Sequence, residues 1–345
     1  MDGIISKTAC NKWVRTSWRV ALPLAVGAFV LYWVYRDFDF AQARQVLLHQ
    51  TNWGWMGLSL VFGVLSHVLR GWRWRLALTP LGCRPRLGDC VDAIFISYAA
   101  SLVLPRIGEV TRCGVLRRSG GVPFSQSLGT VVTERLIDVL CVLVVTALAF
   151  AVQLPVFITF FAQTGTKIPS LAHLLGSPWF YVSLLCVVGV GVLAWGLLRL
   201  FGLPRRLRAA VHGVCQGLLS VSRVRSVPLF VALTVLIWVC YYLHFTLTFL
   251  CFPFTAHLSP LAGLVMFVAG TIAVIVPTPN GAGPWHFAVI TMMMLYGVSP
   301  ANSGTFALIV HGVQTLLVIL LGVGGWLRLQ VNGKWTEAPA KTPLA

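Results

Sequence analysis

The chain alternates long apolar stretches with short polar loops, and this pattern constrains its fold more than any other feature. A helix needs ~20 apolar residues to span a bilayer, and about six stretches approach or exceed that length: 18–35, 53–72, 125–152, 178–201, 227–251 and 303–327. Hydrophobic residues make up 57% of the 345 positions and charged residues only 10%. A soluble domain cannot bury that much apolar side chain, so we predict an all-α polytopic membrane protein.

Two further apolar regions, residues 88–118 and 260–297, are interrupted. The first break reads LVLPRIGEVTR, from Leu102 to Arg112, and the second reads VPTPNGAGPWH, from Val276 to His286. Proline removes a backbone donor and glycine permits unusual backbone angles, so neither region continues as one straight helix. We predict two broken re-entrant hairpins, giving about eight membrane segments in all. Full crossing of the membrane by both regions is the alternative.

The charge of the chain is strongly basic, with 26 Lys and Arg against 9 Asp and Glu and a net charge of +17. Such a balance occurs in nucleic-acid-binding proteins, but basic residues also gather in the cytoplasmic loops of membrane proteins. The second interpretation suits the apolar stretches, so we expect no nucleic-acid partner. Residues 1–17 are interpreted as a cytoplasmic segment before an uncleaved signal anchor.

The positions of the basic residues also predict an orientation. If the chain starts inside and each broken region returns to its own side, the outside receives Arg36, Arg44 and Lys167 alone. The inside receives Arg73/Arg75/Arg84/Arg86, Arg117/Arg118, Arg205/Arg206/Arg208, Arg223/Arg225, Arg328 and Lys334. We therefore predict cytoplasmic N- and C-termini, an inner-membrane location, a membrane domain over 18–328 and a disordered tail over 329–345. The helices around the two hairpins would then form an inverted repeat.

Acidic residues are so rare that their positions are informative, and none occurs between Asp138 and Glu337. Glu134 and Asp138 are four residues apart, so they share one face of a predicted membrane helix, which must point into the protein. With the first break, this face predicts a buried network of Arg106, Glu109, Arg112, Glu134, Arg135 and Asp138. The network would bind substrate, or it is a static salt-bridge cluster that pins the hairpin to the helix.

The breaks have a second use, because a half-helix should begin near Glu109 and another near Pro284. Helix N-termini bind phosphate or carboxylate, and glycine lets a ligand approach the backbone closely. His286 is the one side chain of the second broken region that titrates near neutral pH. We therefore predict a second half-site of Asn280, Gly281, Gly283 and His286. A simple inter-helix turn with a hydrogen-bonded histidine is the alternative, and His67, His244 and His311 are assigned to packing.

The sequence offers no pattern for metal or cofactor chemistry. Nine cysteines are scattered singly and eight histidines lack ligand spacing. No nucleophile elbow, P-loop or dinucleotide fingerprint occurs. We therefore predict no metal, no cofactor and no catalytic residue.

Four motifs together resemble a known family. They are RGWRWRLAL (70–78), LPRIGEVTRCGVLRR (104–118), ERLIDVL (134–140) and PTPNGAGPWHFAV (277–289), in this order. The chain resembles the lysylphosphatidylglycerol synthase transmembrane region family, a flippase-like membrane domain, here without the aminoacyltransferase domain. It departs from the family pattern at Ala99–Ser101, where asparagine is usual, at Asn280, in place of a glycine, and at His286, in place of an acid.

The resemblance implies a protein that binds an anionic phospholipid or lipid-linked precursor, or moves it between leaflets. The arginines would neutralise the headgroup phosphate, and the acids would hold them in place or contact a cationic part of the headgroup. The protein would not be an enzyme. Two alternatives are a membrane transferase acting on a lipid-phosphate carrier and a non-transporting scaffold. The expected partners are membrane lipid and either a second copy of the chain or a partner membrane enzyme.

Overall fold

The computed structural model describes residues 24–154, 205–220 and 223–333, together with positions 178, 181, 182, 185 and 189. Every secondary-structure element within these residues is helical, as the apolar pattern predicts. The predicted segment 1–17, most of the predicted span 178–201 and the tail from residue 334 lie outside the described residues. The helix before this tail continues to Val331, past the predicted domain end at residue 328.

Three of the described helices are both long and apolar enough to cross a membrane: Phe124–Val152, Val227–Cys251 and Pro300–Val331. They are α6, α11 (Val227–Thr246) with its short extension Leu247–Cys251, and α14. Helix α3 (Trp53–Leu78) is 26 residues long, but polar residues such as His67 and Arg70 dilute its apolar stretch. The first predicted span is described from residue 24 onward, as the apolar helix Leu24–Tyr35.

Both interrupted regions form helical hairpins. The first consists of α4 (Leu87–Val103) and α5 (Ile107–Gly120), and the second of α12 (Pro260–Ala273) and α13 (Pro284–Leu295). The two helices of each pair pack against each other, and each helix has only 12 to 17 residues. That is short of the ~20 residues needed to span a bilayer. The breaks lie where the prolines and glycines predict them, and Pro284 occupies the first turn of α13.

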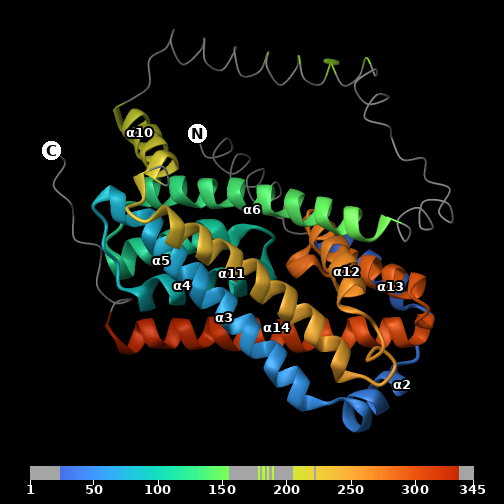
Figure 1. The fold of residues 1–345 in the computed structure, drawn as a ribbon. Coiled ribbons are helices and arrows are strands. Elements are labelled where there is room, and N and C mark those ends of the chain that lie inside the picture. The colour runs from blue at the N-terminus through green and yellow to red at the C-terminus, as the bar shows by residue number, and fades with distance from the viewer. Residues whose placement is uncertain are drawn as a thin grey trace, which may run out of the picture.

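The long helices connect the two hairpins. Helices α3 and α11 pack side by side and cross the view diagonally between α6 and α14 (Figure 1). Helix α6 contacts both α5 and α12, and α14 contacts both α13 and α4. The contact with α4 is close, because a Cβ atom at Gly322 would overlap Ala99. The two hairpins therefore share a common frame.

The open ends of the two hairpins lie at opposite ends of α14. Helix α13 leads through a short turn at residues 296–299 directly into the start of α14. At the other end, Asn332 shares a cleft with Arg86, before α4, and Ser119, near the end of α5. The hairpins thus run in from opposite ends, and their breaks meet between them. This is the arrangement that an inverted repeat requires.

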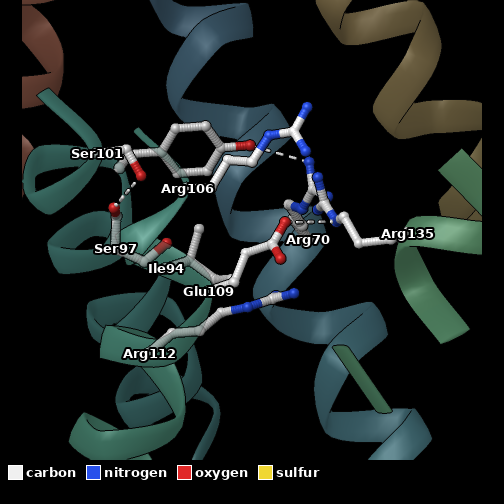
Figure 2. A pocket seen from close by; sticks show the side chains of 9 residues that line it. Arg70, Ile94, Ser97, Ser101, Arg106, Glu109, Arg112 and Arg135 are labelled. Atoms are coloured by element: carbon white, nitrogen blue, oxygen red, sulfur yellow. Dashed lines mark hydrogen bonds and ion pairs between the residues drawn. The ribbon is translucent and has the colours of Figure 1, made fainter. Parts of the chain in front are cut away.

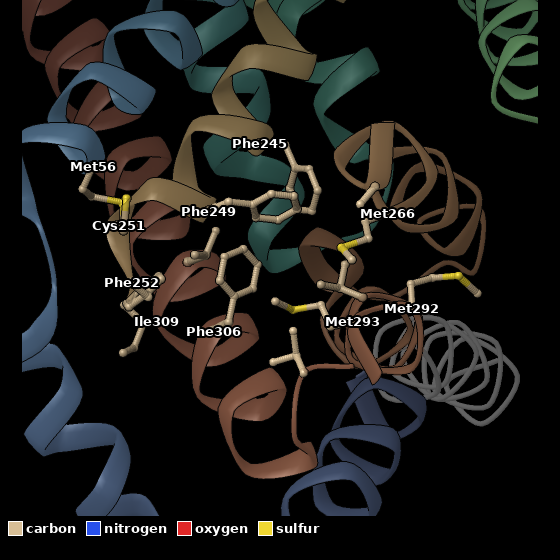
Figure 3. Close-up of a cluster of buried hydrophobic side chains, with 14 of the residues drawn as sticks. Met56, Phe245, Phe249, Cys251, Phe252, Met266, Met292, Met293, Phe306 and Ile309 are labelled. Carbon is tan, nitrogen blue, oxygen red and sulfur yellow. The ribbon is translucent and has the colours of Figure 1, made fainter. Parts of the chain in front are cut away.

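The second hairpin is anchored by the largest cluster of buried apolar side chains. Phe245 and Phe249 pack against Phe306 of α14 with ring centroids 6.3 and 5.6 Å apart, and Met266 and Met293 approach from α12 and α13 (Figure 3). A second cluster surrounds Trp74 and packs the first hairpin against α3 and α6. Aromatic and methionine side chains fill such irregular spaces well.

Two further helices, α2 (Phe40–Gln45) and α10 (Arg205–Ser220), pack around these segments. Helix α2 is capped by Asp39, whose side chain accepts from the backbone N–H groups of Ala41 and Gln42. Helix α10 crosses α6 where glycine faces glycine. A Cβ atom at Gly129 or Gly217 would overlap the opposing backbone, so the crossing depends on both.

Candidate functional site

A cavity of about 170 Å³ lies beside the first break, and charged side chains dominate its wall (Figure 2). Helix α4 supplies apolar and hydroxyl groups, and α3, α5 and α6 supply the charges. The lining residues are Arg70, Ile94, Ser97, Tyr98, Ser101, Arg106, Glu109, Arg112 and Arg135. Four of the six predicted network residues therefore line one cavity.

Glu134 lies behind this wall, fully buried as its position on the inward helix face predicts. An Nη atom of Arg112 lies 2.6 Å from its carboxylate. The Arg112 guanidinium also lies over the Trp74 ring, 4.9 Å from the centroid. One Nη atom of Arg112 is thus engaged by Glu134, and its other Nη atom has no hydrogen-bond partner within the described residues. Arg112 is only 2% exposed and lines the cavity, so this second donor is buried at the cavity wall.

Asp138 joins three arginines. Its carboxylate contacts Arg70 and lies 3.0 Å from both Arg73 and Arg135. Arg70 also donates to the hydroxyls of Tyr98, at 2.9 Å, and Tyr241, at 2.8 Å. The Asp138 carboxylate is thus occupied by cations on three sides.

The sequence interpretation missed Arg70 and Arg73 as members of the network, and it wrongly counted Arg73 among loop residues. Arg73 is fully buried in α3 and contacts both Glu134, at 3.6 Å, and Asp138. The two arginines lie three residues apart on α3, and the predicted membrane span 53–72 covers most of this helix. That spacing was the signal, because two membrane carboxylates on one face require cations from a neighbouring helix.

Arg106 differs from the prediction. It lines the cavity but makes no salt bridge with any residue that the structure describes. Its guanidinium instead donates to the backbone carbonyl of Ile275 in the second hairpin, at 3.2 Å. Glu109 pairs with Arg135, at 3.4 Å, and both side chains remain about 40% exposed. Arg106 was predicted to join the network of Glu134 and Asp138, but among the described residues the carboxylates of that network contact other arginines.

The predicted second half-site lies apart from this cavity. The Asn280 amide donates to Thr315 at 2.9 Å. Gly281 and Gly283 have positive φ angles of 71° and 92°. A Cβ atom at Gly283 would lie 2.9 Å from Val30, so this glycine admits the apolar helix Leu24–Tyr35. None of the four predicted residues, Asn280, Gly281, Gly283 and His286, lines the arginine-rich cavity.

His286 is buried in contact with other rings. It is 3% exposed, and its Nδ1 accepts the backbone N–H of Gly283 at 3.4 Å at the start of α13. Its ring centroid lies 5.6 Å from Tyr35 and 4.5 Å from His311. His311, which was assigned to packing, lies 3.1 Å from the Asn280 carbonyl and so contacts the second break directly. His311 lies on α14, about one helix away from the second break along the chain, so sequence spacing alone did not predict that contact.

The charges around the cavity do not balance. Four arginines and one glutamate line it. Adding the contacting residues Arg73, Glu134 and Asp138 gives five arginines against three carboxylates, an excess of two positive charges. In Figure 2 the guanidinium groups of Arg70, Arg106 and Arg135 point to the same side of the cavity. Excess positive charge at a partly buried site favours binding of an anion such as phosphate.

Within the described residues, no group of three or more His, Cys, Asp or Glu side chains is placed to hold a metal ion. The cysteines described there are free thiols. The chemistry of the site is therefore that of arginine, hydroxyl and carboxylate groups.

The comparisons with known proteins agree with the motifs. The chain is 28% identical over 306 residues to a protein of Haloferax volcanii named glycosyltransferase AglD, an alignment that covers 79% of this chain and 48% of that protein. The chain thus spans about half the length of this curated relative. No solved structure matches. The profile of the lysylphosphatidylglycerol synthase transmembrane region matches residues 20–322. The chain therefore belongs to the family of the lysylphosphatidylglycerol synthase transmembrane region.

Proposed function

We propose that this membrane protein binds the phosphate of an anionic lipid or lipid-linked precursor in the arginine-lined cavity and moves it between leaflets. The observation that carries the proposal is the excess of two positive charges around the cavity. An uncompensated charge in a membrane interior costs several kcal/mol, and a bound phosphate would remove that cost.

The residues divide into two roles in this proposal. Arg70, Arg106, Arg112 and Arg135 line the cavity and would neutralise the phosphate. Arg112 is the best placed, since it is buried at the cavity wall and its second Nη atom has no hydrogen-bond partner within the described residues. The predicted site acids Glu134 and Asp138 would fix these arginines, since each already contacts at least two arginines.

The surroundings of the cavity favour a lipid over a soluble anion. Exposed apolar side chains flank the lining residues in the sequence: Val103 is 67% exposed, Val110 48% and Leu136 61%. In a membrane these side chains would contact acyl chains. A headgroup could then occupy the cavity while its tails stay in the bilayer.

The membrane topology belongs to the same proposal. The hairpin α4–α5 would enter from the cytoplasmic side and α12–α13 from the other side, with the termini cytoplasmic and the protein in the inner membrane. The opposed hairpins along α14 and the basic residues near Arg86 and Arg117 support this orientation.

A lipid-transport assay tests the function. Proteoliposomes of phosphatidylcholine containing a trace of fluorescent phosphatidylglycerol would be treated with an impermeant quencher. We expect wild-type protein to speed exchange of the label between leaflets, and Arg112→Gln to slow it by roughly tenfold or more, the effect expected of removing a buried charge contact. Arg117→Gln, an exposed change at the end of α5, is the control. No exchange above empty liposomes would reject transport.

A membrane transferase acting on a lipid-phosphate carrier is the second candidate, because the Haloferax volcanii relative is named a glycosyltransferase. A carboxylate that acts as general base must be free to accept a proton. Glu134 and Asp138 are both held by arginines, and Glu109, which lines the cavity, pairs with Arg135. Formation of a glycosylated lipid by purified protein from a sugar donor and a lipid phosphate would favour the transferase. Lipid binding without exchange or product would favour a scaffold for a partner enzyme.

A further inference from the structure

The two broken hairpins are joined by one hydrogen bond, from Arg106 to the carbonyl of Ile275. Helix α12 ends at Ala273, just before this carbonyl. Beyond Ala273 the chain leaves the helix, Thr278 is in an extended conformation, and Pro277 and Pro279 have no N–H groups to donate. The Ile275 carbonyl therefore lies at the negative end of α12, and the Arg106 guanidinium satisfies it.

Arg106 is held less firmly than the other arginines of the cavity. Its side chain is exposed, it forms no ion pair with any residue that the structure describes, and its own backbone has a φ of 64°. A positive φ is unfavourable for a non-glycine residue, and it places Arg106 at the N-cap of α5. Its guanidinium points to the same side of the cavity as those of Arg70 and Arg135 (Figure 2).

A phosphate would compete for this side chain. A hydrogen bond from guanidinium to an ionised oxygen is roughly twice as strong as one between neutral groups, and a phosphate accepts two such bonds at once. A single neutral carbonyl is therefore the weaker partner. The like charges of Arg70 and Arg135, which line the same cavity, also favour moving Arg106 onto an anion.

The first part of the segment that would lose its partner, residues 274–278, has few other hydrogen bonds to support it. It is held by short turns, such as Ile275 N–H to the Ile272 carbonyl at 3.0 Å and Thr278 N–H to the Val276 carbonyl at 2.8 Å. Asn280, by contrast, also contacts Thr315 and His311 of α14. Release of Ile275 would free the end of α12 while α13 stays anchored by Met293 and its neighbours.

We propose that Arg106 is a ligand-operated latch: it holds the second hairpin through Ile275 when the cavity is empty, and a bound phosphate draws it away and loosens residues 274–278. This inference rests on the proposed function, since it requires an anion in the cavity. It assigns Arg106 a role that couples the cavity to the second break.

Hydrogen–deuterium exchange of the full chain in nanodiscs tests the latch. In wild type, adding phosphatidylglycerol to phosphatidylcholine nanodiscs should speed exchange of the amides within residues 274–278 by roughly threefold to tenfold, the effect of losing one hydrogen bond. Arg106→Gln should show that faster exchange already in phosphatidylcholine, with no further gain. Arg117→Gln should behave as wild type. Inorganic phosphate, added to phosphatidylcholine nanodiscs, shows whether a free anion is sufficient.

Binding of fluorescent phosphatidylglycerol, measured on the same samples, separates the two proposals. Binding with unchanged exchange at residues 274–278 would overturn the latch and leave the proposed function standing. Absence of binding would overturn both. Slow exchange in Arg106→Gln without anionic lipid would show that the Ile275 contact holds nothing, and would also overturn the latch.

Discussion

At the residue scale, ion pairs between distant helices hold the first hairpin. Arg112 of α5 contacts Glu134 of α6, and Arg70 and Arg73 of α3 contact Asp138 of α6. Each of these charges would be costly in a membrane interior without its partner. The network therefore fixes three helices relative to one another, whatever ligand the cavity binds.

The Arg112–Glu134 pair gives a stability prediction. Glu134→Ala should lower the free energy of unfolding by ~3–5 kcal/mol, because it leaves Arg112 buried with a weaker set of partners. Arg112→Ala should cost a similar amount, and the double variant should cost ~1–3 kcal/mol less than the sum. Unfolding in mixed micelles measures all three. Asp37→Ala, which removes an exposed pair with Arg36, should cost under ~1 kcal/mol. Additive effects at Arg112 and Glu134 would show that the two side chains do not interact.

His286 gives a second prediction at this scale. Its ring accepts the Gly283 N–H and so caps the start of α13. His286→Leu should lower the free energy of unfolding by ~1 kcal/mol, the usual effect of losing a helix cap. His286→Gln retains an acceptor and should cost less. Because His286 does not line the cavity, both variants should bind phosphatidylglycerol as wild type does. Weaker binding in His286→Gln would instead place this residue in a ligand site.

At the element scale, close packing of helices depends on single glycines. Helices α6 and α10 cross at Gly129 and Gly217, where an added Cβ would overlap opposing backbone. The same crossing includes a hydrogen bond from the Thr133 hydroxyl to the Leu218 carbonyl at 3.0 Å. Helix α10 is thus fixed to α6 through backbone proximity rather than through large apolar side chains.

Gly129→Ala and Gly217→Ala test this crossing. Each should lower the free energy of unfolding by ~1–3 kcal/mol, because the helices must separate to admit a methyl group. Gly114→Ala is the matched control: it lies in α5, and a Cβ atom added there would have no neighbouring atom within 4 Å. That change should be neutral or stabilising by up to ~1 kcal/mol. Equal effects at all three glycines would contradict the tight crossing.

At the scale of the whole molecule, the opposed hairpins predict which surfaces face each side of the membrane. Single cysteines would replace Arg117, near the open end of the first hairpin, and Ser299, at the open end of the second, in a cysteine-free background. An impermeant thiol reagent applied to intact cells should label the Ser299 position, and the Arg117 position should react only after permeabilisation. Labelling of both from the same side would contradict an inverted arrangement.

Local sequence was enough to predict the long apolar helices that the structure describes and the two breaks. Apolar stretches longer than a bilayer is thick predict membrane helices, and the confirmed breaks follow from Pro105 in one hairpin and Pro277, Pro279 and Gly283 in the other. The i,i+4 spacing of Glu134 and Asp138 likewise predicted an inward-facing acidic face, since helix periodicity is local. Each of these inferences uses residues within a few turns of one another.

Only the tertiary structure decided which side chains meet across helices. Arg70 and Arg73 reach Asp138 from more than 60 positions away, and His311 reaches the second break from α14. Arg106 reaches Ile275 rather than a carboxylate of the predicted network. Periodicity shows that a face points inward, but it does not specify the neighbouring helix, its rotation or its depth. Those are set by the packing of glycines and aromatic side chains between helices. The sequence therefore determined a helical membrane protein with two broken hairpins, and the packing of those helices determined that one arginine-rich cavity lies beside the point where the breaks meet.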